Sequence, residues 1–124
     1  MSILFFGFAL ADSMFEDGTI TRRTLDMSDD SDELESLLLS AAETGTLVSC
    51  CNPSHVATID AMRQRYGLQV GIPDTPPRVK LADGDRILVM GVRGLPRLTD
   101  RHEYTADEVA SATFNFTLYI YSKA

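Results

Sequence analysis

Residues Leu47–Gly67, LVSCCNPSHVATIDAMRQRYG, are the stretch around which the rest of the chain is arranged. It opens with an apolar run, Leu47–Cys51, that is typical of a buried strand. Asn52 suits a helix cap, Pro53 the first helical position and Gly67 the residue after a helix. Between them, apolar side chains recur at helical spacing: Val56, Ile59, Met62 and Tyr66. The stretch predicts a strand, a tight turn and an amphipathic helix.

The segments on either side predict an α/β (α+β) fold with a mixed sheet flanked by helices, in a single domain of residues 1–124. Helices are expected at Asp32–Glu43 and after the capping box Thr105–Glu108. Strand patterns occupy Ile3–Leu10, Thr19–Leu25, Arg78–Leu81, Arg86–Val92 and the alternating run Phe114–Tyr121. We expect the first two strands to pair as a hairpin with a wide loop, and the next two to form a hairpin around residues 82–85.

The composition restricts the kinds of partner that the chain can bind. The 124-residue chain is 44% hydrophobic and 23% charged, with a net charge of −7 that opposes general binding of long nucleic acid. The charge is uneven, because residues 1–62 hold 2 basic and 11 acidic side chains and residues 63–124 hold 9 and 7. Most of the positive charge is arginine, whose fork of donors suits phosphate. The alternative is that these charges are solvated surface pairs.

The two cysteines, Cys50 and Cys51, are adjacent. In a strand they point to opposite faces, so they make a poor disulfide, and they lack the partners of a zinc site. Buried thiols of a reducing compartment are expected, together with no metal and no cofactor. The apolar run Ser2–Leu10 has no basic residue before it and is too short to span a bilayer, which predicts a cytoplasmic protein without a membrane segment.

His55 has three interpretations. Its spacing places it on the stripe of Ile59 and Met62, where a half-buried structural histidine is common. A strand that leads into a helix start also binds anions, because free N–H groups and the helix dipole point there, so His55 is a candidate for phosphate contact or proton transfer. Ser54 beside it can donate a hydroxyl. A Cys50–His55 nucleophilic pair is the third interpretation.

The loop Arg93–Asp100, RGLPRLTD, is the second candidate site. Arg97 and Asp100 are three residues apart, so the carboxylate can orient the guanidinium as a clamp for a phosphate or a developing negative charge. The alternative is an exposed salt bridge of little energetic value. Arg78, which follows two prolines, is a further candidate phosphate ligand.

Several short segments follow one another in a characteristic order. They are His55-x-x-Thr58-Ile59, Arg78-Val79-x-Leu81, Gly84-Asp85-x-Ile87-Leu88-Val89, Arg97-Leu98-x-Asp100 and Thr105-x-x-Glu108. This ordered set resembles the viral ring nucleases, small anti-CRISPR proteins of archaeal viruses and phages that counter type III immunity. The resemblance covers most of residues 47–121 and is that of a divergent phage-borne branch, marked by Asn52-Pro53-Ser54-His55 and Gly94-Leu95-Pro96-Arg97.

The resemblance implies a homodimer in the host cytoplasm with a cyclic oligoadenylate bound across the dimer interface. The implied reaction needs no metal: a ribose 2′-hydroxyl attacks the adjacent phosphorus and leaves a 2′,3′-cyclic phosphate. His55 would protonate the leaving 5′-oxygen, Arg97 would stabilise the phosphorane, and Asp100 stands where the family has a glutamate. Arg78 matches a binding arginine, and Asn52, Ser54 and Arg93 are the other expected ligand contacts. Ser54 stands where the family usually has glycine.

Three functions therefore remain open from the sequence. The chain is a metal-independent phosphodiesterase that opens a cyclic oligonucleotide, a non-catalytic sponge that sequesters the same signal, or a phage protein–protein interaction module that uses the acidic surface of residues 26–43.

Overall fold

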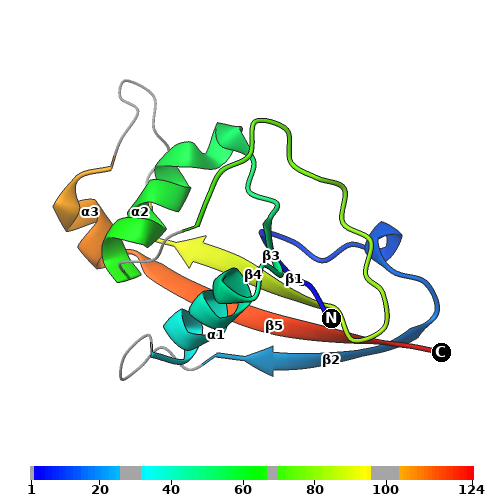
Figure 1. Cartoon of the computed structure of the whole chain (residues 1–124). Coiled ribbons are helices and arrows are strands. Elements are labelled where there is room, and N and C mark those ends of the chain that lie inside the picture. The colour runs from blue at the N-terminus through cyan, green and yellow to red at the C-terminus, as the bar shows by residue number, and fades with distance from the viewer. Residues whose placement is uncertain (1, 26–31, 67–69, 96–103) are drawn as a thin grey trace.

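The apolar runs of the sequence form a five-stranded mixed sheet with the strand order β2-β5-β4-β1-β3. The computed structural model describes residues 2–25, 32–66, 70–95 and 104–124. The strands are β1 Leu4–Gly7, β2 Gly18–Thr24, β3 Leu47–Ser49, β4 Arg86–Arg93 and β5 Thr113–Lys123. β1 pairs in parallel with β3 and β4, and β5 pairs antiparallel with β4 and β2 (Figure 1). This confirms the predicted fold class.

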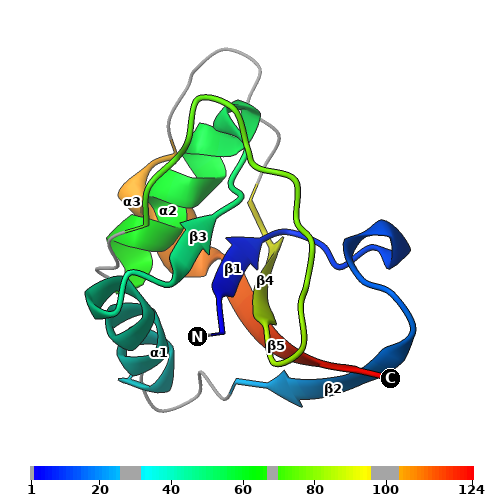
Figure 2. The same cartoon turned by 45° about the vertical axis from the view of Figure 1, so that its right-hand side comes forward.

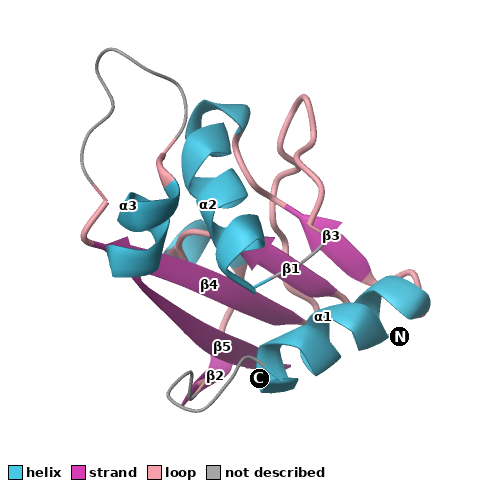
Figure 3. Cartoon of the chain, turned by 90° about the vertical axis from the view of Figure 1, so that its left-hand side faces the viewer, coloured by secondary structure: helices cyan, strands magenta, loops and turns pink. Residues whose placement is uncertain are grey.

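The helices lie on one face of this sheet (Figure 3). They are α1 Asp32–Glu43, α2 Val56–Tyr66 and α3 Ala106–Ser111. Two 3₁₀ turns, η1 Asp12–Met14 and η2 Pro53–His55, lie in the connections that follow β1 and β3. α1 ends as predicted, since Gly45 adopts the left-handed φ of 71° that a helix stop requires. α3 begins with the predicted capping box, in which Thr105 and Glu108 bond to each other's backbone N–H groups. Within the described ranges, no helix is long and apolar enough to cross a membrane.

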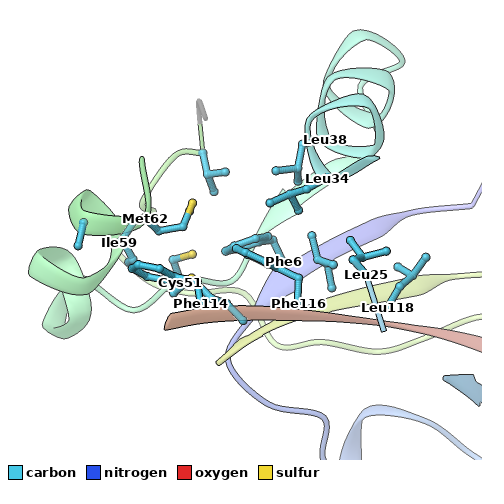
Figure 4. Packing of buried hydrophobic residues seen from close by; sticks show 14 of the residues in the cluster. Phe6, Leu25, Leu34, Leu38, Cys51, Ile59, Met62, Phe114, Phe116 and Leu118 are labelled. Atoms are coloured by element: carbon cyan, nitrogen blue, oxygen red, sulfur yellow. The ribbon is translucent and has the colours of Figure 1, made fainter. Parts of the chain in front are cut away.

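The main core fills the space between the helices and the sheet. Figure 4 shows Leu34 of α1 and Ile59 of α2 packed towards Phe6 and Phe116, and all four side chains are fully buried. β5 contributes alternate residues, because successive side chains of a strand point to opposite faces. Burying a side chain of this size stabilises the fold by roughly 1.5–3 kcal/mol.

A smaller cluster lies on the other sheet face and includes Phe5, Ile87 and Tyr121. Val79 and Leu81, from the irregular stretch between α2 and β4, cover it. The turn before β4 is closed by Asp85, which is only 6% exposed. Its carboxylate oxygens accept the backbone N–H groups of Ile3 and Ala82, each at 2.9 Å.

Both predicted hairpins are wrong. β2 pairs with β5, not with β1, because β1 already has a parallel neighbour on each side. Residues 78–81 form no ladder with β4. The N–H of Leu81 instead donates to the carbonyl of Met14 at 2.7 Å, so this stretch crosses the sheet face. Pro76 and Pro77 just before it lack the N–H donors that a strand ladder needs.

Candidate functional site

The carboxyl ends of three parallel strands meet at one edge of the sheet. In Figure 2 the arrowheads of β1 and β4 point the same way, towards the end of the molecule where the chain enters α2. At this carboxyl edge, β1 leads to Phe8, β3 leads to residues 50–55, and β4 ends at Arg93. Ligands of α/β proteins usually bind outside the carboxyl ends of parallel strands, so the topology marks this edge as the candidate site.

His55 lies at the start of α2 on this edge. It closes turn η2, and its backbone N–H donates to the carbonyl of Asn52 at 2.9 Å. Ile59 and Met62 are buried, whereas His55 is exposed, so the interpretation of His55 as a half-buried structural histidine is wrong. The His55 ring contacts Phe8, with centroids 5.2 Å apart and ring planes at 51°. The imidazole is therefore accessible at a helix start, where N–H groups and the helix dipole attract anions.

Two predicted ligand residues lie in this turn or directly before it. Asn52 is exposed at the end of the β3–α2 connection, where its carbonyl accepts the His55 N–H. Ser54 lies within η2, and its side chain lies outside the described part of the structure.

Some arginine side chains bond to other residues of the protein, and others, called uncommitted below, bond to no described residue. Arg63 bonds the carbonyl of Val70 and forms an ion pair with Asp60 at 2.9 Å. Arg65 donates to the carbonyls at the end of α3, those of Val109, Ala110 and Ala112. These two side chains hold α2 to its neighbours and do not serve a ligand.

Arg93 and Arg78 are the uncommitted arginines among the predicted site residues. Both are exposed, and no described residue bonds to either guanidinium. Arg93 ends β4 at the carboxyl edge, the same edge as His55. Arg78 lies on the stretch that crosses the sheet face. Arg97 and Asp100 lie outside the described residues.

The cysteines follow β3 at this edge as free thiols. Burial, and secondly the neighbouring Cys51, raise the pKa of Cys50 to about 11. Burial also raises the pKa of Cys51, although the Ser49 hydroxyl and Arg63 lower it in part. Both thiols are protonated at neutral pH, which disfavours the Cys50–His55 nucleophilic pair, since the thiolate is the attacking form.

Phe8 is the site residue that sequence reasoning missed. Its place in the apolar run ILFFGFAL predicted a buried strand position. The strand ends at Gly7, and Phe8 is half-buried beyond it. The glycine that interrupts the run was the available signal for that end.

Among residues 2–25, 32–66, 70–95 and 104–124, no three His, Cys, Asp or Glu side chains come together as a metal site would need.

The fold is similar to that of a known viral protein. B116 of Sulfolobus turreted icosahedral virus superposes with a TM-score of 0.69 and is 21% identical, over 95% of this chain and 98% of the viral chain. No protein-family model and no curated protein matches the sequence. At this identity, the likeness establishes the fold of the chain.

Proposed function

We propose that the chain is a viral anti-defence protein that binds a cyclic oligoadenylate second messenger at the carboxyl edge and opens it without a metal. The observation that carries the proposal is the exposed His55 imidazole, placed at the start of α2 beside the ends of three parallel strands. The fold shared with a viral protein supports a viral origin, and hence action in the host cytoplasm.

The reaction we propose forms one bond and breaks one. A ribose 2′-oxygen attacks the adjacent phosphorus and loses its proton to solvent, and the bond from phosphorus to the 5′-oxygen breaks. His55 donates a proton to that leaving oxygen as general acid. Arg97 stabilises the charge that develops on the phosphorane, and Asp100 orients Arg97. The products are a 2′,3′-cyclic phosphate and a 5′-hydroxyl.

Ligand binding in this proposal depends on local positive charge. The chain is acidic overall, but Arg93 at the end of β4 has an exposed guanidinium to which no described residue bonds. Arg78, Asn52 and Ser54 provide further donors. A small polyanion held at a helix start by a few arginines does not need the basic surface that long nucleic acid requires. A homodimer that places two such edges around one ring is part of the proposal.

A sponge is the alternative, and Ser54 is the feature that favours it. A serine directly before His55 adds a side chain where the resembled family has glycine, so it restricts close approach of the ligand to the backbone. Such a site would hold the ring without opening it.

The test is to incubate the pure protein with cyclic tri-, tetra- and hexa-adenylate in EDTA, and to follow melting temperature and product chromatography. Linear products with 2′,3′-cyclic phosphate ends are expected. Thermal stabilisation with intact ligand recovered after denaturation would identify a sponge. No change in melting temperature and no product with any ring would contradict both functions and favour an interaction module.

A further inference from the structure

The His55 side chain makes a ring contact with Phe8. Among the described residues, Phe8 is the aromatic side chain beside the imidazole, with ring centroids 5.2 Å apart. The hydrogen bond from the His55 N–H to Asn52 fixes the backbone of the turn. It leaves the side-chain torsions of His55 free, so these depend on what the imidazole touches.

Phe8 is well placed to fix those torsions. It is half-buried and packs against the main core, so its own position is set by the interior of the protein. Its ring nevertheless reaches the exposed His55. The two residues follow adjacent parallel strands, β1 and β3, so the contact joins two separate connections at the carboxyl edge. An aromatic pair of this kind favours one arrangement by roughly two- to tenfold in population.

We propose that Phe8 is a positioning residue, which holds the His55 imidazole in the orientation that proton donation requires. The link to catalysis rests on the function proposed above. An exposed imidazole without such a contact distributes itself among staggered rotamers, and only one of them aims the ring nitrogen at a given leaving oxygen. Phe8 acts through His55, and it neither donates a proton nor binds the phosphate.

Two substitutions distinguish the effect of the Phe8 ring from the effect of its apolar bulk. Phe8→Leu keeps an apolar side chain against the core but removes the ring, whereas Phe8→Tyr keeps the ring. The first measurement uses no ligand. In protein labelled at histidine, NMR reports the ring-current shift of the His55 ring protons and the couplings that define its χ1 rotamer, and His55→Gln assigns the signals.

We expect the wild type and Phe8→Tyr to show ring-shifted His55 signals and one dominant rotamer. Phe8→Leu should show shifts near those of an unstructured peptide and averaged couplings, at a melting temperature that confirms a folded protein. Unchanged His55 shifts and couplings in folded Phe8→Leu would overturn the proposal. This outcome does not depend on whether the protein cleaves anything.

The second measurement is kinetic and uses the cyclic oligoadenylate that the wild type opens. Positioning predicts that Phe8→Leu lowers single-turnover kcat about tenfold and leaves Kd within about twofold, while Phe8→Tyr stays close to wild type. A raised Kd with unchanged kcat would overturn the proposal and make Phe8 a ligand contact. If the wild type opens no ring, the function proposed above fails, and the NMR result alone decides whether Phe8 positions His55.

Discussion

The two edges of the sheet use polar side chains in opposite ways. At the amino edge, Asp85 is buried, and its carboxylate accepts two backbone N–H groups. At the carboxyl edge, His55 and Arg93 are exposed, and no described residue hydrogen-bonds to either side chain. Asp85 therefore satisfies the backbone groups around it, whereas His55 and Arg93 have no such side-chain hydrogen bond among the described residues. This difference, more than any single motif, is the reason for choosing the carboxyl edge as the candidate site.

Replacing His55 should separate activity from stability most strongly. His55→Ala removes the proposed general acid, and a loss of about 10²- to 10⁴-fold in single-turnover cleavage is expected. Its exposure predicts little change in the free energy of unfolding. Cleavage kinetics and urea unfolding of the same preparation measure both. Activity close to wild type would remove His55 from the mechanism.

Replacing Asp85 should lower the stability of the protein and leave ligand affinity unchanged. Asp85→Ala leaves the partly buried N–H groups of Ile3 and Ala82 without this acceptor, which should cost roughly 1–3 kcal/mol of unfolding free energy. Asp85→Asn keeps one acceptor oxygen and should lose about half as much. Urea unfolding gives the values, and ligand affinity of the folded fraction should not change. A stable Asp85→Ala variant would show that this edge does not depend on the carboxylate.

Arg93 tests whether an uncommitted arginine at the carboxyl edge contacts the ligand. Arg93→Ala should weaken cyclic oligoadenylate binding by about five- to tenfold, the value of an exposed charge-assisted contact of roughly 1 kcal/mol, with little loss of stability. Arg22, an exposed arginine on β2, is the matched control. Equal effects of Arg93→Ala and Arg22→Ala in isothermal titration would indicate general charge attraction without a site.

Cys50 provides the smallest effect, in the pH dependence of stability. Its pKa is raised from 9.0 to about 11 by burial and by Cys51, so the folded state favours the protonated thiol. The stabilisation is complete below pH 9 and is lost as pH rises towards 11. Urea unfolding at pH 8 and pH 10 should show a fall that is smaller in Cys50→Ala. The fall is modest because Cys50 is only half-buried.

Local signals in the sequence predicted the helices α1 and α3 well. The structure confirms the bounds predicted for α1, Asp32–Glu43, and the Thr105–Glu108 capping box predicted the start of α3. Strand partners were not predictable in the same way. The sequence of β2 contains no information that distinguishes β1 from β5 as its neighbour, because pairing depends on which edges other strands leave open.

The candidate site was predictable only in part, because some of its features depend on local sequence and others on strand pairing. The position of His55 near a helix start was predictable from Asn52, Pro53 and the helical spacing after them, although Pro53–His55 form the turn η2 and α2 begins at Val56. Its contact with Phe8 joins residues 47 positions apart and arises only when β1 and β3 pair. The roles expected of Arg97 and Asp100 stay predictions, since both lie outside the described residues.

The central claim is that the ligand binds at the carboxyl edge, and backbone NMR tests it most directly. The ring that the wild type binds is added as its 2′-O-methyl analogue, which lacks the attacking hydroxyl and stays intact. We predict that the amide signals of Asn52, His55, Val56 and Arg93 shift on titration, while those of Gly84, Asp85 and Arg86 at the amino edge do not. Shifts confined to the amino edge would contradict the account.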